Sequence, residues 1–447
     1  MNNQQNQRKE HTAFSGFIAL AVCILALLAF LFWENSAEAE PTMISLGTDA
    51  IDISGRGAEV TGVSGAAADG EIVTIVQGGH YRITGALEDG QIYVDCDDEK
   101  VLLELAGVTL GNSSEAAIHI ENAESATILL AEGTENFLQS GNANGNAGAD
   151  SSDGGKKGDG AVIYAEGDLL ITGEGALKVA GMLNNGIQSK AGLRIDSGCI
   201  EVEAAGHAVK GKDDVTIEGG EFRLSAGKKG IQAKYELYIT GGNFLIAESE
   251  EGLEANQVII EGGIFDITAS DDGINANGGE DKKKKKPSED IVETMPNLII
   301  RGGILHINAE GDGLDSNGNL LIEGGELVID GPTKDDDGPL DYGKENDGFC
   351  QIKGGMVLAV GSSGMAETFD ESSEQCSFRY LFNKPYEAGT EIIITDADGR
   401  ELYRHKAAKP GASVVFSSPE LALGETYTLR AGEFSTEIVQ DSVSAGK

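Results

Sequence analysis

Short runs of alternating apolar and polar residues recur along most of the chain, and many of them border a Gly-Gly pair. Alternation with a period of two is the pattern of a β-strand with one buried face. None of these runs keeps a 3.6-residue period long enough for a helix. Five segments superimpose without gaps, at residues 215–224, 237–246, 258–267, 298–307 and 320–329.

The spacing of the Gly-Gly pairs defines a repeat. The pairs begin at residues 219, 241, 262, 302, 324 and 354, so the normal step is 21 or 22 residues, and the steps of 40 and 30 each contain an insertion. A second short element follows the pairs, as in Lys229-Gly-Ile-Gln-Ala and Asp272-Gly-Ile-Asn-Ala. Each repeat therefore holds two or three short strands separated by glycine turns.

A repeat of about 21 residues with short strands is the coil of a parallel β-helix. We predict an all-β fold in which such coils stack at about 4.8 Å, so that equivalent residues form columns. Two inner columns are expected. They consist of Phe222, Phe244, Phe265, Leu305 and Leu327, and of Ile187, Val209, Ile231, Leu253, Ile274 and Leu314.

Three parts of the chain are predicted: an N-terminal segment (1–40), the parallel β-helix (41–369) and a C-terminal module (370–447). Residues 141–160 and 278–296, the latter with a run of five lysines, have too few apolar side chains to pack and are expected to project as loops. Beyond residue 370 the repeat stops, and alternating runs separated by turns predict a small antiparallel β module that caps the helix.

The N-terminal segment contains an uncharged apolar run at residues 13–33, with Arg8 and Lys9 before it and Glu34 after it. A cleavage site at 37–39 suits a signal peptide, whereas the length of the run suits a transmembrane anchor. Both alternatives place the rest of the chain outside the cytoplasm, either secreted or attached to the membrane at the cell surface.

Composition narrows the choice of partner. The 74 acidic and 33 basic side chains leave a formal net charge of −41, which argues against a nucleic-acid partner because phosphates require a basic face. The five cysteines show no CxxC spacing, so neither a zinc site nor a disulfide framework is indicated.

Outward-facing residues of the second element fall in register as well. One column runs through Gln188, Lys210, Gln232, Glu254, Asn275, Asp315 and Asp341. Carboxylates stacked at about 4.8 Å repel one another unless they are protonated, hydrated or bridged by a cation, and hard oxygen ligands suit calcium. We predict one or more calcium sites among Glu251, Glu254, Asp271, Asp272, Asn275, Asp312, Asp315, Asp337 and Asp341. The alternative is that the Asp-Gly and Asn-Gly pairs serve only as turns.

A neighbouring outward column is basic at its N-terminal end, with Lys190, Lys212 and Lys234. We expect these lysines to contact the carboxylates of an acidic polysaccharide lying along the solenoid, with Lys210 as a further binding residue and Tyr235 as a candidate aromatic platform. The alternative is that they are solvated charges paired with nearby acids, which contribute little each.

The chain resembles a bacterial family of exported carbohydrate-binding β-helix proteins that are related in shape to the pectate lyases. The segments that carry the resemblance are Asn184-Asn-Gly-Ile-Gln-Ser-Lys, Asp271-Asp-Gly-Ile-Asn-Ala-Asn, Gly311-Asp-Gly-Leu-Asp-Ser-Asn and Ser413-Val-Val-Phe-Ser-Ser-Pro. The resemblance implies a right-handed parallel β-helix with bound calcium that binds cellulose or acidic sugars such as polygalacturonate. It also implies that Asp272 and Asp312 belong to a calcium site.

Three function classes follow from these observations. The leading one is a non-catalytic, calcium-dependent polysaccharide-binding protein, for which no catalytic residue is assigned. A calcium-dependent polysaccharide lyase of the pectate type is the second, since a lysine could act as its base, although the clustered arginine motif of the pectate lyases does not occur in this sequence. The third is a surface adhesin or scaffold.

Overall fold

The computed structural model describes residues 40–47, 50–62, 71–97, 99–141, 160–277 and 295–446. The apolar run at 13–33, the lysine run at 282–286 and most of the predicted loop at 141–160 lie outside these ranges. Within them, the only helix is a single 3₁₀ turn, η1 (Lys344–Asn346), and no helix that could cross a membrane occurs.

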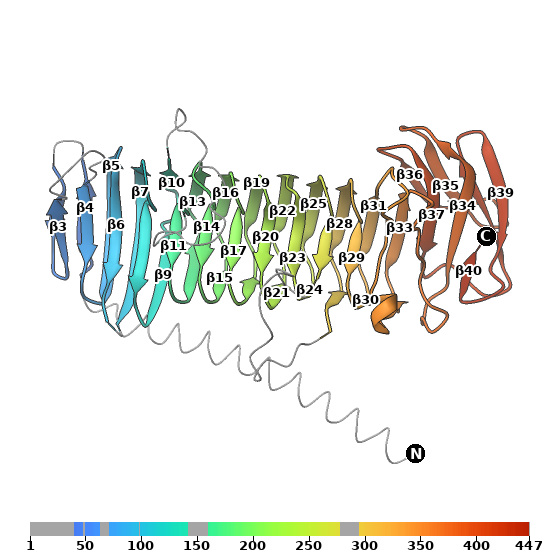
Figure 1. The fold of residues 1–447 in the computed structure, drawn as a ribbon, viewed down its shortest axis with the longest axis horizontal. Coiled ribbons are helices and arrows are strands. Elements are labelled where there is room, and N and C mark those ends of the chain that lie inside the picture. Colours follow the sequence, from blue (N-terminus) through green and yellow to red (C-terminus); the bar gives the residue numbers. More distant parts are fainter. Residues whose placement is uncertain are drawn as a thin grey trace, which may run out of the picture.

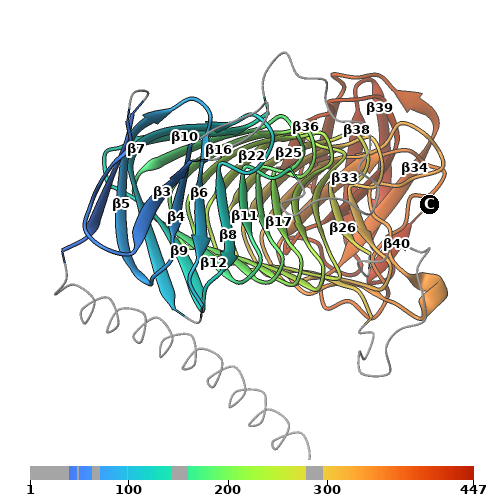
Figure 2. The ribbon, with the colours of Figure 1, turned by 60° about the vertical axis from the view of Figure 1, so that its left-hand side comes forward.

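The protein is an elongated stack of coils, with an antiparallel module at its C-terminal end (Figure 1). Each regular coil passes through three strands, as in β18 (Val215–Ile217), β19 (Glu221–Ala226) and β20 (Lys229–Ala233). Each strand pairs in parallel with its equivalent one coil later. In the turned view the coils follow one behind another (Figure 2). The prediction of an all-β fold built as a parallel β-helix is therefore confirmed.

One side of the helix is an 11-stranded sheet, parallel except where β3 pairs with β4. Its strands are β3 (Ala58–Gly62), β4 (Glu71–Ile75), β6 (Gly90–Asp95), β8 (Ile118–Asn122), β11 (Ile163–Ala165), β14 (Ile187–Ser189), β17 (Val209–Gly211), β20, β23 (Glu251–Ala255), β26 (Ile274–Ala276) and β29 (Leu314–Ser316).

The other two sides are parallel ladders within one 25-stranded sheet. The first ladder contains β9 (Ser125–Leu130), β12 (Leu169–Gly173), β15 (Leu193–Ile195), β18, β21 (Glu236–Ile239), β24 (Gln257–Ile260), β27 (Asn297–Ile300), β30 (Asn319–Ile322) and β32 (Cys350–Ile352). The second contains β10 (Glu135–Ser140), β13 (Ala176–Gly181), β16 (Cys199–Ala204), β19, β22 (Asn243–Glu248), β25 (Ile264–Ala269), β28 (Ile304–Ala309), β31 (Glu326–Asp330) and β33 (Met356–Gly361). At the N-terminal end, β1 (Thr42–Leu46), β2 (Asp52–Ser54), β5 (Gly79–Leu87) and β7 (Lys100–Asn112) extend this sheet, and β7 pairs with both β9 and β10.

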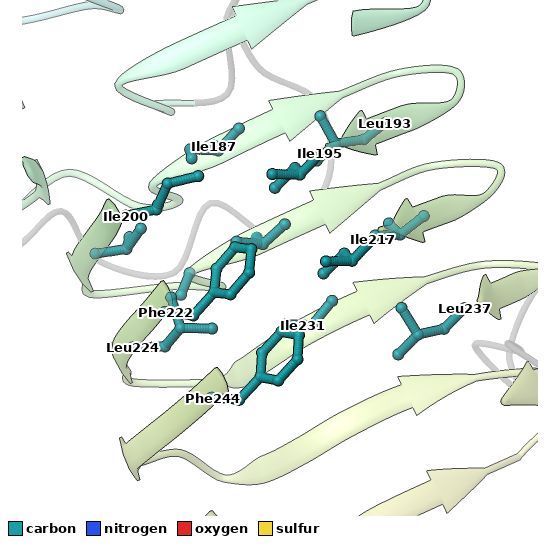
Figure 3. Packing of buried hydrophobic residues seen from close by; sticks show 14 of the residues in the cluster. Ile187, Leu193, Ile195, Ile200, Ile217, Phe222, Leu224, Ile231, Leu237 and Phe244 are labelled. Atoms are coloured by element: carbon teal, nitrogen blue, oxygen red, sulfur yellow. The ribbon is translucent and has the colours of Figure 1, made fainter. Parts of the chain in front are cut away.

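Both predicted inner columns are present. The rings of Phe222, Phe244 and Phe265 stack with centroids 4.7 and 4.5 Å apart and 4° between planes. Leu305 and Leu327 continue this column in register, and the six aliphatic residues of the other column are fully buried. Side chains from all three sides of each coil meet in the middle of the helix (Figure 3).

The second glycine of each Gly-Gly pair is required by the geometry of the corner between the two ladders. Gly242 has φ +111°, a conformation that favours glycine, and a Cβ there would lie 3.1 Å from the carbonyl oxygen of Gly220 and from the ring of Phe244. The repeated Gly-Gly pair thus allows neighbouring coils to approach closely at this corner, while a ring such as that of Phe244 packs against the turn.

The C-terminal module attaches through antiparallel pairing of β33 with β37 (Gly411–Ser417), which also pairs with β34 (Ser377–Tyr386). Its remaining strands are β40 (Ser444–Gly446), beside β34, and the antiparallel sheet of β35 (Glu391–Thr395), β36 (Glu401–Lys406), β38 (Thr426–Ala431) and β39 (Phe434–Val439). The Nε2 atom of His405 lies 3.0 Å from an oxygen of Asp330, so polar contacts also hold the module against the last coils.

Candidate functional site

The outer face of the 11-stranded sheet carries the predicted polar column. Parallel pairing puts Gln188, Lys210, Gln232, Glu254, Asn275 and Asp315 in register on successive strands. Asp341 follows one coil later, because Leu340 bridges to Leu314 and the N–H of Asp341 donates to the carbonyl of Leu314. We call this set the outer column.

A second column lies beside it, in the turn that precedes a strand or at the strand's first residue, and we call it the turn column. It consists of Asn185, His207, Lys229, Glu251, Asp272 and Asp312, each three residues before a member of the outer column. Asn185, His207 and Lys229 were not singled out by the sequence analysis. The alignment of the short elements places them in register, but their residue types vary so much along the column that no common chemistry was visible.

Asp272 and Asp312 each use one carboxylate oxygen to accept a backbone hydrogen bond at a turn. Oδ1 of Asp272 accepts a 2.8 Å hydrogen bond from the N–H of Asp312, and Oδ1 of Asp312 accepts one of 2.6 Å from the N–H of Gly338. Each aspartate therefore fixes the turn of the following coil, as expected for an Asp-Gly turn. The second oxygen of each carboxylate remains for other partners.

Asp312, Asp315 and Asp341 form the first acidic group, in which one oxygen of each residue lies within 4.8 Å of the others. Burial raises the pKa of Asp315 to about 8, and the carboxylates of Asp272 and Asp312 raise it too. Burial also raises the pKa of Asp312 to about 8, against the hydrogen bond from Gly338. Three carboxylates packed this closely are costly to ionise unless a cation joins them.

Glu251, Asp271 and Asp272 form the second acidic group, again within 4.8 Å. It has a resident cation, since Nζ of Lys229 lies 2.5 Å from Oε1 of Glu251. Burial raises the pKa of Asp272 to about 6, and the neighbouring Asp271 carboxylate adds to the shift.

Six of the nine predicted calcium ligands thus fall into these two groups. Glu254 is buried in the outer column and accepts hydrogen bonds from the side-chain amides of Gln232 and Asn277. Asp337 is half-buried at the edge of the same face. Asn275 lies between the groups and donates from Nδ2 to Oδ2 of Asp272 at 3.0 Å, which leaves its Oδ1 as an acceptor.

The predicted carbohydrate contacts lie on the coils before the acidic groups. Lys210 belongs to the outer column, and Lys190, Lys212 and Lys234 follow the ends of β14, β17 and β20. Nζ of Lys234 lies 4.6 Å from the ring centre of Tyr235 and donates to its hydroxyl, and Tyr235 is 36% exposed. The five residues are therefore brought to one side of the helix, beside the carboxylates and one to six coils away from them.

Comparison with known proteins places the chain in a family. A family model described as a carbohydrate-binding domain-containing protein matches residues 69–338. The chain belongs to this family. A protein of the same description from Acetivibrio thermocellus is 33% identical over 190 residues, which are 42% of this chain and 65% of the relative, so the chain spans less than two thirds of that protein.

A solved structure is also similar, namely that of the polysaccharide lyase-like protein from C. thermocellum in a gadolinium derivative. The match has 24% sequence identity and a TM-score of 0.41, and it covers 70% of this chain and 97% of the other.

Four successive coils of this carbohydrate-binding family member each leave one buried polar atom of the outer face without a hydrogen-bond partner. Among the described residues these atoms are Nδ1 of His207, Oε1 of Gln232, Oε2 of Glu251 and Oδ1 of Asn275. Burial lowers the pKa of His207 to about 2, and nearby lysines lower it as well, so the imidazole is neutral. A buried polar atom without a partner costs about 1–3 kcal/mol, which a bound ligand can recover.

Aromatic residues extend the outer column toward the N-terminus, a feature the sequence analysis missed. His119 packs edge-on between Tyr93 and Tyr164, with ring centres 5.2 and 4.9 Å apart. The irregular spacing of the early coils concealed this register. His119 and Tyr164 are only 4% and 2% exposed, so they contribute to packing more than to an open surface.

A groove of about 440 Å³ lies elsewhere, at the corner between the two ladders. Its lining residues include Gly198, Gly220, Gly242, Glu174, Glu221 and Asn243. No member of the two acidic groups and none of the predicted carbohydrate-binding lysines lines it, so it is separate from the face described above.

The calcium-free protein is expected to lose stability as pH rises from about 4 to about 8. Asp312 and Asp315 have a pKa of about 8 in the folded chain against an ordinary 3.8, so within this window the folded chain holds protons that the unfolded chain has released. Thermal unfolding in chelator across this range would measure the slope. The slope should be shallower in Asp312→Asn/Asp315→Asn, and an identical slope in both proteins would contradict the assignment.

Proposed function

We propose that the protein binds an acidic polysaccharide along the outer face of the 11-stranded sheet, without cleaving it, through calcium held by the first acidic group and through the lysines of the preceding coils. The observation that carries this proposal is the row of four buried, unpartnered polar atoms on successive coils. It begins on the coil of Lys212, ends one coil before Asp312 and Asp315, and runs along the axis of the solenoid. A linear polymer with a hydroxyl on each sugar fits such a row.

Calcium suits the donors at the C-terminal end of this row. Asp312, Asp315 and Asp341 supply carboxylate oxygens, and the unpartnered Oδ1 of Asn275 supplies an uncharged one. Calcium accepts six to eight oxygen ligands in flexible geometry, so it would balance two of the three carboxylate charges and retain positions for a carboxylate of the ligand. It would thereby reduce the repulsion between this acidic end and a polyanion.

The lysines would reduce the repulsion of a polyanion at the N-terminal end of this row. A net charge of −41 repels a polyanion at long range, so a local basic surface is needed to bring it near. Lys212 and Lys234 are exposed beside the outer column, at a spacing of one coil. Ammonium groups repeated at about 4.8 Å can follow the carboxylates of a polymer that lies along the axis.

Binding should be measured with polygalacturonate and with cellulose, in calcium and in chelator. Calcium-dependent retention on polygalacturonate supports the proposal, and equal binding in both media contradicts it. Retention on cellulose alone would assign a neutral glucan as the ligand instead. The same samples, followed by ultraviolet absorbance, would reveal unsaturated products if the protein is a lyase.

The triple variant Lys190→Gln/Lys212→Gln/Lys234→Gln is expected to bind polygalacturonate several-fold more weakly at low salt. Exposed ion pairs contribute about 0–1 kcal/mol each and are screened by salt, so the difference should shrink as salt is added. Isothermal titration at two salt concentrations would measure it. The control replaces Lys353, which follows the end of β32 in the first ladder and pairs with Glu323. Equal affinity of the triple variant and the parent at low salt would return these lysines to the role of solvated charges.

We also propose that the protein acts outside the cytoplasm, secreted or anchored through residues 13–33. The apolar run and its flanking charges support this location. Fractionation of cells that express the full chain and a variant without residues 1–40 would test it. Equal recovery of both proteins in the cytoplasm would contradict export.

A further inference from the structure

The second acidic group differs from the first in having a cation of its own. Nζ of Lys229 lies 2.5 Å from Oε1 of Glu251, 3.5 Å from Oε2 of Glu250 and 3.8 Å from Oε2 of Glu254. The ammonium therefore contacts three carboxylates from the following coil. No lysine or arginine forms a described ion pair with Asp312, Asp315 or Asp341 in the part of the chain that the structure covers.

Lys229 is well placed to act as a fixed counter-ion. It belongs to the turn column, and parallel pairing of β20 with β23 puts it directly beside Glu251. Its side chain is only 14% exposed, and that of Glu251 is 8% exposed. A buried carboxylate needs a partner of opposite charge. For Glu251 this partner is Lys229, which lies on the preceding coil.

The site around Glu251 nevertheless has the other features of a cation site. Glu251, Asp271 and Asp272 offer oxygens within 4.8 Å of one another. Glu251 as a whole residue is only 6% exposed, and its Oε2 has no hydrogen-bond partner among the described residues. The group therefore has an unpartnered buried oxygen as well as clustered carboxylates.

We infer that Lys229 fills a second divalent-cation site with its own ammonium group and thereby confines calcium to the Asp312, Asp315 and Asp341 group. The ammonium balances one unit of charge at Glu251 and excludes a divalent ion from the adjoining oxygens by charge repulsion. The inference rests on the proposed calcium site for its comparison, but it concerns a different set of carboxylates.

Replacing Lys229 by methionine keeps an unbranched side chain and removes the charge. The variant Lys229→Met should bind one more calcium ion per chain than the parent, as measured by equilibrium dialysis of the full chain against calcium followed by elemental analysis. The matched control is Lys228→Met, an exposed neighbour with the same change in net charge, which should bind as many ions as the parent. Lys229→Arg keeps the charge and should also match the parent. An unchanged count in a folded Lys229→Met protein would overturn the inference.

A second variant keeps the test decisive if Lys229→Met does not fold. Glu251→Gln should bind the same number of calcium ions as the parent, because the ammonium already occupies the position beside Glu251. Loss of one ion from Glu251→Gln would show that Glu251 is a calcium ligand in the natural chain and would overturn the inference. The two proposals fail separately. A parent that binds no calcium refutes the first site, whereas the difference between Lys229→Met and the parent still measures the second.

Discussion

Removing calcium is expected to lower the thermal midpoint of the protein by about 5–10 °C. A ligand that binds only the folded state stabilises it by mass action, by about 4 kcal/mol when its concentration is 1,000 times the dissociation constant. Chelation should also restore the repulsion among Asp312, Asp315 and Asp341, whose oxygens lie within 4.8 Å of one another. Differential scanning calorimetry in calcium and in chelator would measure the shift.

Two variants give this experiment its controls. Asp315→Asn/Asp341→Asn removes two of the three charges, so its midpoint should hardly respond to the chelator. Glu203→Gln changes an exposed carboxylate on the second ladder, and it should respond like the parent. A parent whose midpoint is the same in both media, and which contains no metal by elemental analysis, would refute the calcium site.

Periodicity was sufficient to predict the fold because it specifies contacts at long range. A step of 21 or 22 residues says which residues of neighbouring coils are in register, and the observed pairing of Phe222 with Phe244 and of Phe244 with Phe265 follows from that step alone. The pattern predicts the outer column for the same reason. It works only where the step is regular, and it therefore missed the contacts of His119 in the early coils.

The chemistry of the face was harder to predict than its geometry. Glu251 was predicted to be a calcium ligand because its turn adjoins the acidic part of the outer column, and Lys229 was not considered as its partner. Only the structure shows that the two side chains are 2.5 Å apart. The alignment of Lys229-Gly-Ile-Gln-Ala with Glu251-Gly-Leu-Glu-Ala contains this information, since first positions of aligned elements become neighbours in a parallel helix.

Truncation of Phe244 is expected to be the most damaging single change in the β-helix. Its ring is the middle one of the three-ring stack and is 3% exposed. The cost of Phe→Ala in a core, about 3–5 kcal/mol, depends on how far the surroundings can collapse into the cavity. Here the flanking rings belong to strands whose separation is fixed by parallel pairing, so collapse is limited and the upper part of that range is expected.

The matched control for Phe244→Ala is Leu245→Ala, the next residue of β22, whose side chain points outward and is half-buried. It should cost less than about 1 kcal/mol, because little apolar surface is withdrawn from the core. Denaturant unfolding of both variants would compare the two faces of one strand. Because the coils interact mainly with their neighbours, the loss should appear as earlier unfolding of the coils around β19, β22 and β25, which hydrogen exchange can locate. Equal losses from the two variants would mean that the phenylalanine column does not hold the coils together.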